Sequence, residues 1–257
     1  MILENPIVTV KDVLNIYKSK IHGIDALKSH MNWFPVFSTP VLAGIVADLM
    51  CDGHLQKNKW RFDFTSKSKV ELKHFGRRVY DLFGIEGKIR PCPTNKFGTT
   101  FNYGVNCKPL SRILYLCGVP RGCKVKKEFL IPDWVMNNKE CFREFIKRAF
   151  TCEGSVDVHG RFITFEMWKS KELIGNGLKF MNQIRNGLRR YFYIKTSKVF
   201  IPNGFNIRKD GVVTKPLRFV IKSDSVKKFY DKIEFDNKEK QNKLKLAVWG
   251  GSWDGNN

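Results

Sequence analysis

An internal repeat constrains the fold of this chain more than any other feature of its sequence. Two segments, VLAGIVADLMCDG ending at Gly53 and ECFREFIKRAFTCEG ending at Gly154, each predict a helix that ends in an acid followed by glycine. They stand roughly 100 residues apart, and each is followed by a predicted hairpin, a second helix, a strand pair and a closing helix. The chain is therefore expected to hold two α/β units that lie side by side about a pseudo-twofold axis, rather than a solenoid.

The first unit has clear start and stop signals. Ser38-Thr39-Pro40 predicts the start of its first helix, and Ser68 with Glu71 predicts a capping box for a middle helix that runs to Gly84. Alternating residues predict a hairpin over 54–67, with Trp60, Phe62 and Phe64 on one face. A strand pair over 88–107 and a short helix over 109–117 complete the unit.

The second unit repeats this order. Its predicted elements are strands over 155–158 and 162–167, a middle helix from 170 to about 191, a strand pair over 195–221 and a last helix from about 223. We divide the chain into an N-terminal extension (1–37), a first repeat with its connecting segment (38–135), a second repeat (136–235) and a C-terminal tail (236–257). Residues 10–31 have a helix-like pattern, and the charged residues over 236–245 indicate either a solvated helix face or a frayed end.

The charge of the chain indicates an anionic partner. Lys and Arg number 46 against 24 Asp and Glu, a formal net charge of +22, and the basic residues are spread through the whole chain. Such an excess favours nucleic acid over a solvated basic surface on an ordinary enzyme. The seven cysteines form no CxxC pair and the five histidines show no HExxH spacing, so structural zinc is not expected. Without a signal peptide or an apolar run long enough to span a membrane, we expect a soluble, intracellular protein, in cytoplasm or organelle, with reduced thiols.

The two helix ends, IVADLMCDGHL and FIKRAFTCEGSV, resemble the motifs of the LAGLIDADG homing endonuclease family, and GVPRGCKVKKEFLIPDWV (118–135) resembles the family's connecting segment. The resemblance covers about residues 40–235. It implies an α+β fold of two pseudo-symmetric αββαββα repeats, with the motif helices packed at the centre and two antiparallel four-stranded DNA-binding sheets. It also implies an intron-encoded, monomeric, site-specific endonuclease that hydrolyses phosphodiesters on both strands of a long, asymmetric double-stranded DNA target.

The resemblance makes Asp52 and Glu153 the paired catalytic carboxylates and metal ligands, with Gly53 and Gly154 at the metal site and at the turn into the first strand. A carboxylate at a helix C-terminus faces the negative end of the helix dipole, which favours a bound cation. The implied cofactor is Mg²⁺, as two or three ions; Mn²⁺ is expected to substitute, and Ca²⁺ to bind without supporting cleavage. The alternative is that both acids are ordinary turn residues.

A basic or polar residue after the second strand pair usually assists catalysis in the family. That position falls on Lys222 in the second repeat and near Asn106–Lys108 in the first, and a solvated lysine at a strand end is the alternative for Lys222. Ser66 and Lys169, at the ends of the first hairpins, are weaker candidates.

Two residues depart from the family pattern. Arg148 stands where the family usually has a glycine for close helix contact, whereas the first motif has Ala47, so Arg148 must swing out or be paired, or the helices pack differently. Asp48 is also unexpected, and a basic neighbour such as Arg148 is its expected partner.

Polar residues on the outer faces of the hairpins are the candidates for DNA contact, because a β-ribbon fits the major groove. About half are expected to contact phosphate or solvent instead of bases, and Trp60 and the phenylalanines are expected in the core. The candidates are Gln56, Lys57, Asn58, Lys59, Arg61, Asp63, Thr65, Arg90, Asn95, Lys96, Thr99 and Asn102 in the first half, and His159, Arg161, Thr164, Glu166, Lys198, Asn203, Asn206, Arg208, Lys209 and Arg218 in the second.

Other functions stay open on the sequence. An RNA-binding intron maturase, with intron RNA as partner, and a cleavage-inactive DNA-binding protein would both use this fold, but neither needs the acids, and both acids are present. An unrelated basic RNA-modification enzyme is a further alternative. Intein residency is not expected, because the chain begins with Met and leaves no room for splicing blocks. Residues 1–37 either extend the DNA contact or cover the first sheet.

Overall fold

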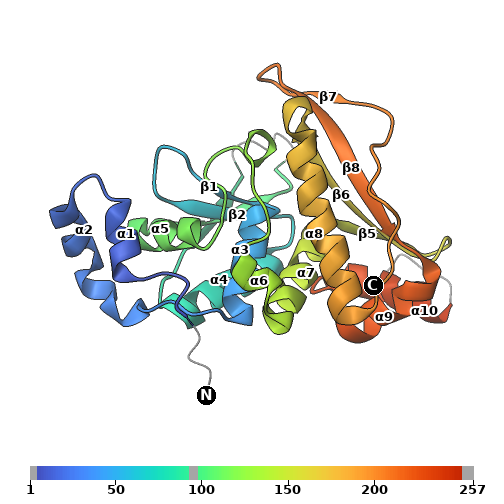
Figure 1. Cartoon of the computed structure of the whole chain (residues 1–257), viewed down its shortest axis with the longest axis horizontal. Coiled ribbons are helices and arrows are strands. Elements are labelled where there is room, and N and C mark those ends of the chain that lie inside the picture. The colour runs from blue at the N-terminus through green and yellow to red at the C-terminus, as the bar shows by residue number, and fades with distance from the viewer. Residues whose placement is uncertain (1–4, 93–97, 251–257) are drawn as a thin grey trace. The chain divides into compact units, whose positions relative to one another are not determined.

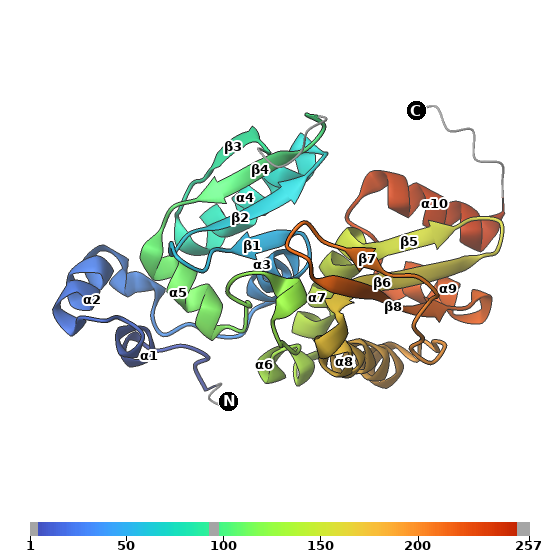
Figure 2. The ribbon, with the colours of Figure 1, turned by 90° about the horizontal axis from the view of Figure 1, so that it is seen from above.

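The computed structural model describes residues 5–92 and 98–250, which form two compact units (Figures 1 and 2). The first unit runs to Lys124 and includes Pro132–Cys141, and the second contains Val125–Ile131 and the chain from Phe142 onward. Each unit holds helices and one four-stranded antiparallel sheet, so the predicted α+β class with two repeats is confirmed.

The N-terminal extension belongs to the first unit. The helix-like stretch over 10–31 is broken into α1 (Val10–Asn15), α2 (Lys20–Leu27) and the 3-10 helix Lys28–Trp33, because α1 ends at Asn15 and the Ser19 side chain caps a new helix. The Trp33 indole donates a hydrogen bond to the Phe83 carbonyl oxygen at 2.9 Å, and Val8 pairs with Val36. The sequence sets residues 1–37 apart, whereas in the structure residues 5–37 pack on the first repeat.

The first repeat follows the predicted order. Its elements are α3 (Pro40–Met50), β1 (Gly53–Leu55), β2 (Phe62–Ser66), α4 (Lys69–Phe83), β3 (Lys88–Pro91), β4 (Phe101–Val105) and α5 (Lys108–Leu116), and the sheet order is β1-β2-β4-β3. Thr39 caps α3, Ser68 caps α4, and Gly84 ends α4 with a φ of 66°. The hairpin is shorter than expected, and Trp60 lies in its turn rather than in β2.

Aromatic packing buries one face of the first sheet against α4. The Phe75 ring stacks on Phe64 at 4.9 Å between centroids and meets Phe62 and Tyr103 edge-on. All four side chains are less than a tenth exposed. Because strand residues alternate between faces, this packing leaves the other face of the sheet to solvent.

The second repeat has the same order. Two short elements precede it, the 3-10 helix Lys124–Lys126 and α6 (Asp133–Met136). It comprises α7 (Lys139–Glu153), β5 (Gly154–Asp157), β6 (Phe162–Ser170), the 3-10 helix Lys171–Leu173, α8 (Ile174–Phe192), β7 (Asn206–Ile207), β8 (Val213–Ile221), α9 (Ser223–Lys232) and α10 (Lys238–Trp249). Its sheet order is β5-β6-β8-β7. The strand pair over 195–221 is mostly β8, because β7 has only two residues.

The core of the second unit is also aromatic. Phe150 of α7 lies 4.8 Å from Phe165 and 4.9 Å from Phe229 between ring centroids, and Phe165 stacks on Phe219 at 5.5 Å. The charged tail forms a regular helix, α10, which packs against α9 and β5. The tail that the sequence sets apart is therefore part of this unit as far as residue 250.

All seven cysteines are free thiols, as expected, and four of them are buried. Burial raises the pKa of Cys117 to about 12. Within residues 5–92 and 98–250, no helix is both long enough and apolar enough to cross a membrane.

Candidate active site and nucleic-acid interface

The acid-glycine junction of the first unit links α3 directly to β1. Asp52 is exposed one residue after the C-cap of α3, and Gly53 begins β1. A Cβ atom on Gly53 would lie 2.7 Å from the Leu49 Cα atom, so any side chain at this position would have to displace the helix backbone. Glycine is thus required here for close approach of strand and helix.

The second junction repeats this geometry. Glu153 is the last residue of α7 and is half-buried, and Gly154 begins β5. A Cβ atom on Gly154 would lie 2.5 Å from the Phe150 carbonyl oxygen, and Phe150, like Leu49, stands four residues before the glycine. The two junctions are therefore equivalent in sequence position and in steric constraint.

Each junction supplies oxygen donors of the kind that Mg²⁺ prefers, namely one carboxylate and the neighbouring backbone carbonyls. Among residues 5–92 and 98–250, no group of three His, Cys, Asp or Glu side chains is arranged to hold a metal ion. A divalent ion at either junction would therefore rely on donors beyond a protein carboxylate cluster, such as phosphate oxygens and water.

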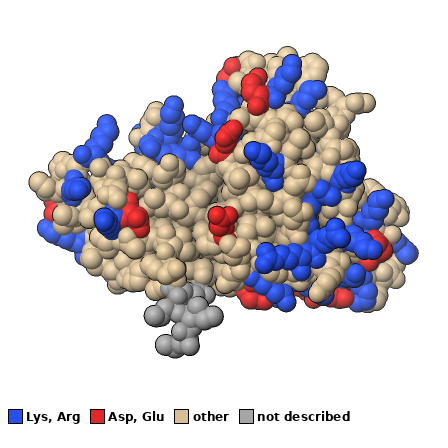
Figure 3. Space-filling view, viewed as in Figure 1, with Lys and Arg blue, Asp and Glu red and all other residues tan. Residues whose placement is uncertain are grey.

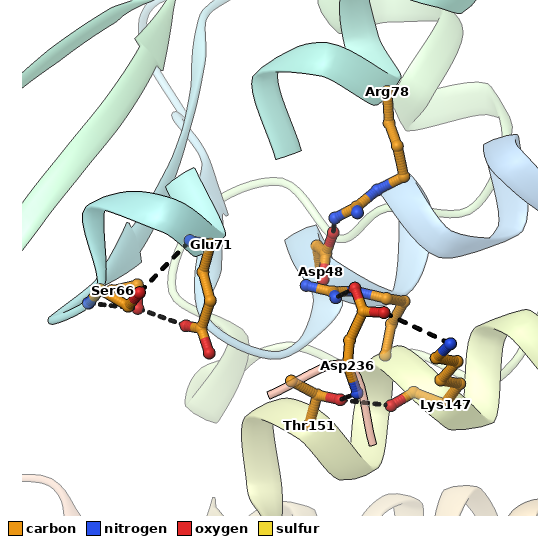
Figure 4. A network of polar contacts seen from close by, with 9 residues as sticks. Asp48, Ser66, Glu71, Arg78, Lys147, Thr151 and Asp236 are labelled. Atoms are coloured by element: carbon orange, nitrogen blue, oxygen red, sulfur yellow. Dashed lines mark hydrogen bonds and ion pairs between the residues drawn. The ribbon is translucent and has the colours of Figure 1, made fainter. Parts of the chain in front are cut away.

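Asp48 and Arg148, the two unusual motif residues, both form ion pairs. Asp48 is fully buried, and its ion pair within the first unit is with Arg78 of α4 at 2.6 Å (Figure 4). Arg148 is buried and pairs through Nη1 with Asp236, whose other carboxylate oxygen lies 3.3 Å from the Lys147 Nζ atom. The Asp236 N–H also donates to the Thr151 hydroxyl at 3.0 Å. The arginine at the glycine position is thus accommodated by pairing within its own unit.

The candidate assisting residues have different environments. Lys222 is exposed between β8 and α9, and Asn106 and Lys108 are exposed at the equivalent place in the first unit. Ser66 donates to the Glu71 carboxylate at 2.5 Å and accepts from the Ser68 N–H, so it serves the start of α4 (Figure 4).

The prediction for Lys169 is wrong. Its side chain is fully buried, its ammonium donates to the Lys127 carbonyl oxygen at 2.7 Å, and it lies 3.7 Å from the centroid of the Phe129 ring. A buried lysine that holds the connecting segment in this way cannot reach a solvent-side phosphodiester.

The solvent face of the first sheet brings several predicted residues together. Across the strands, Asp63 stands opposite His54 and Gly104, and Asn102 stands opposite Thr65 and Arg90. The Thr65 hydroxyl donates to the Asn102 side-chain oxygen at 2.9 Å. A concavity of about 480 Å³ opens on this face, lined by residues that include Arg61, Asp63, Lys88, Arg90, Asn102 and Asn106.

Burial perturbs the two titratable groups at the centre of this face. It raises the pKa of Asp63, which the facing His54 and a hydrogen bond with Gln56 partly offset. Burial also lowers the pKa of His54, with Asp63 opposing that change. The imidazole is thus kept neutral near pH 7, able to donate one hydrogen bond and accept another.

The tip of the first hairpin is held by cations stacked on Trp60. The Arg121 and Arg112 guanidinium carbons lie 4.0 and 4.4 Å from the Trp60 ring centroid, and Arg112 also lies 3.7 Å from the Tyr17 ring of the extension. Arg121 donates to the carbonyl oxygens of Gln56 and Lys57 as well. The predicted DNA contacts Lys57, Asn58 and Lys59 are exposed on this tip.

The second sheet places its predicted residues less compactly. Thr164, Glu166 and Arg218 share its solvent face, and Arg218 Nε donates to the Glu166 carboxylate at 2.7 Å. His159 and Arg161 are exposed in the β5–β6 turn, whereas Lys198, Asn203, Asn206, Arg208 and Lys209 lie along the segment that leads to β8. Asp210 pairs with Lys126 at 2.6 Å and lies 3.5 Å from Arg208.

Some predictions could not be placed, and some residues were missed. Asn95 and Lys96 lie outside the described residues, and Thr99 is exposed just before β4. His54 and Lys88 belong to the solvent face of the first sheet. Strand alternation with Arg90 would have identified Lys88, and the hairpin register, which sets His54 opposite Asp63, would have identified His54. The expectation that the phenylalanines are core residues is wrong for Phe37, Phe200 and Phe205, which are 42%, 43% and 63% exposed.

Two curated proteins are similar to the chain in sequence, and no protein-family model matches it. The tRNA-splicing ligase RtcB of Methanopyrus kandleri is 26% identical over 222 residues, which cover 77% of this chain and 21% of that protein. The RNA polymerase subunit Rpo1N of Methanocaldococcus jannaschii is 28% identical over 263 residues, which cover 91% of this chain and 19% of that protein. The chain spans about a fifth of the length of each, and their names describe different activities.

Two solved structures are similar to the chain along much of its length. The homing endonuclease I-WcaI, bound to its DNA recognition sequence, is 15% identical, with a TM-score of 0.49 over 92% of this chain and 98% of that one. Full-length WhiA from Thermatoga maritima is 12% identical, with a TM-score of 0.49 over 84% of this chain and 62% of that one. The chain itself has two αββαββα units, each with an acid-glycine junction at the end of its motif helix, and this is the α+β topology that the resemblance to the LAGLIDADG family implies.

Proposed function

We propose that the chain is a site-specific endonuclease that binds a long, asymmetric double-stranded DNA and hydrolyses one phosphodiester on each strand. The observation that carries the proposal is the equivalence of the two junctions. In both units an acid stands at the C-terminal end of the motif helix or directly after its C-cap, and the next residue is a glycine. The helix residue four positions before that glycine leaves no room for a side chain there. If Gly53 and Gly154 were unrelated turn residues, there would be no reason to find the same steric constraint at both junctions.

The chemistry assigned to these residues is metal-assisted hydrolysis. Bound Mg²⁺ would supply the positive charge that activates water and stabilises the leaving 3′ oxygen. Asp52 and Glu153 would each hold such an ion at the junction of their own unit, with the carbonyl oxygens at Gly53 and Gly154 as further donors. Lys222, exposed at the end of β8, is proposed to stabilise charge at the phosphate.

The proposed DNA-binding surface is the solvent face of each sheet. In the first unit, acidic, amide and basic side chains line one concavity, and the neutral imidazole of His54 stands opposite Asp63 of that lining. Such groups can form hydrogen bonds with base edges in the major groove. Because the two curated relatives are an RNA ligase and a polymerase subunit that match over only a fifth of their length, we assign neither activity to this chain.

Cleavage of a randomised duplex library with Mg²⁺ tests the proposal. We expect wild-type protein to cut a small set of sequences, to lose cutting in EDTA, and to regain it with Mg²⁺. Asp52→Asn and Glu153→Gln should abolish cleavage but retain binding, because each removes a metal ligand and leaves the sheets intact. Asp81→Asn is the matched control, since Asp81 is an exposed acid paired with Arg77 on α4.

Each other outcome points to a different function. Binding of duplex without cleavage under any divalent metal would indicate a cleavage-inactive DNA-binding protein. Preference for structured RNA over duplex DNA would indicate a maturase. Cleavage by Asp52→Asn at the wild-type rate would exclude that residue from the active site.

A further inference from the structure

The solvent face of the second sheet carries an unusual row of side chains, which we call the aromatic row: Trp168, Glu166, Arg218 and Phe200. In the strand register, Arg218 stands opposite Glu166 on one side and Phe200 on the other. Residues opposite one another in an antiparallel pair point to the same face, and Trp168, two residues after Glu166, shares it. Trp168 and Phe200 are 39% and 43% exposed.

Glu166 accepts hydrogen bonds from the polar groups of the other side chains in this row. Its carboxylate accepts from Arg218 Nε at 2.7 Å and Nη2 at 2.5 Å, and its second oxygen accepts from the Trp168 indole N–H at 3.2 Å. The guanidinium charge is thereby balanced within the row, and the indole N–H is already satisfied. What the row offers to a ligand is chiefly apolar ring surface held in fixed positions.

The first sheet differs in this respect. Among the described residues of β1–β4, no large hydrophobic side chain is exposed, and the solvent face carries His54, Asp63, Lys88, Arg90 and Asn102. The two units thus share one topology but present different chemistry on equivalent faces. An apolar row kept exposed in only one of them is expected to have a binding role.

Basic residues near the aromatic row indicate the class of partner. The segment that carries Phe200 also carries the exposed Lys198 and Lys209, and its Phe205 and Ile207 are 63% and 61% exposed. Aromatic rings among basic side chains suit a ligand with a phosphate backbone and apolar base surface. In the major groove of duplex DNA, the apolar group that base pairs present is the thymine 5-methyl.

Building on the proposed function, we propose that the second sheet reads its half of the DNA site by apolar contact with thymine methyl groups. Trp168 and Phe200 are the specificity-determining residues, whereas the first sheet reads its half through hydrogen bonds. The second half-site is therefore expected to contain thymines whose methyl groups, rather than their hydrogen-bonding edges, determine affinity.

The test uses duplexes recovered from the randomised library and the full-length chain in Ca²⁺. Each thymine is replaced singly by deoxyuridine, which removes only the methyl group. We expect about fourfold weaker binding at each contacted thymine, from about 0.8 kcal/mol per buried methyl. These thymines should fall in one half-site. In Trp168→Ala or Phe200→Ala, deoxyuridine at the matching position should have no further effect.

Two control variants keep the test specific. Arg90→Ala, on the first sheet, should weaken binding but leave every deoxyuridine effect unchanged. Tyr80→Ala removes a 45% exposed ring from α4, which covers the opposite face of the first sheet, and should change nothing. Unchanged deoxyuridine effects in Trp168→Ala and Phe200→Ala, or none in the wild type, would overturn the inference while duplex binding and cleavage stood.

A third result would also overturn it. If single-stranded oligothymidylate or RNA bound more tightly than duplex, and Trp168→Ala abolished that binding, the row would be a base-stacking platform instead. Failure of the proposed function is a separate result, because it would appear already in the wild-type protein, either as no binding of any duplex or as duplex binding without cleavage under any divalent metal.

Discussion

At the scale of single residues, Gly53 and Gly154 bring each candidate carboxylate close to the first strand of its sheet. Gly53→Ala and Gly154→Ala are expected to lower the free energy of unfolding by about 1–3 kcal/mol, because the new Cβ atom overlaps helix backbone in both places. Cleavage should fall as well, since the acid stands on the backbone that must move. Urea denaturation and a single-turnover cleavage assay measure the two effects.

Gly175 provides the control for this prediction. It lies in the first turn of α8, and a Cβ atom there would have no neighbour within 4 Å. Gly175→Ala should therefore stabilise the protein by about 0.5–1 kcal/mol through the smaller entropy cost of ordering alanine. If Gly53→Ala were as stable as Gly175→Ala, the glycine would be an ordinary turn residue.

The sequence identified these glycines but not the reason for them. A sharp turn was expected to need glycine flexibility, whereas the structure shows a steric limit set by Leu49 and Phe150. Steric contact of this kind depends on where a strand departs from its helix, which a pattern of residue types does not specify. The same limitation explains Lys169, whose strand-end position predicted exposure although a carbonyl oxygen of the connecting segment holds its ammonium inside.

At the scale of elements, the first hairpin depends on a stack that joins it to the N-terminal extension. Trp60→Leu is expected to lower stability by about 1–2 kcal/mol and to weaken DNA binding, because both guanidinium groups lose the ring that they contact. Trp60→Tyr keeps an aromatic face and should restore part of both properties. Denaturation and duplex-binding titrations on the three proteins provide the measurement.

The stack also gives the extension a structural role. Arg112 is only 7% exposed and lies between the rings of Tyr17 and Trp60. Tyr17→Leu should therefore affect the hairpin in the same direction as Trp60→Leu, but less, since Arg121 still contacts Trp60. Wild-type DNA affinity in Trp60→Leu would show that the hairpin tip is positioned without the stack.

Elements were predictable from sequence where their determinants are local. The caps at Thr39 and Ser68 and the stop at Gly84 are set by nearby residues, and those helix boundaries agree with the structure. The segment before β8 was not predictable, because only Asn206 and Ile207 form β7 and the rest follows β8 through isolated pairs such as Phe200 with Arg218. Its exposed aromatics depend on that long-range pairing.

At the scale of the whole molecule, the excess of basic residues is distributed rather than confined to one patch. Figure 3 shows Lys and Arg side chains at several separate places on the visible face, with a dense group at the lower right, where Figure 1 draws α9 and α10. Many are far from the solvent faces of the sheets and cannot contact base edges there. We expect these side chains to strengthen DNA binding by neutralising backbone phosphates, which then release their counterions.

Salt dependence separates these two kinds of contact. The logarithm of the binding constant should fall with the logarithm of salt concentration by about 0.9 for each phosphate neutralised, so a wild-type slope steeper than about −5 is expected. Lys59→Ala removes an exposed cation from the hairpin tip and should make the slope shallower by about one. Trp168→Ala removes ring surface and no charge, so it should lower affinity equally at every salt concentration. A shallower slope in Trp168→Ala would mean that the ring positions a phosphate contact. A nearly flat wild-type slope would mean that the net charge of +22 does not contribute to DNA binding.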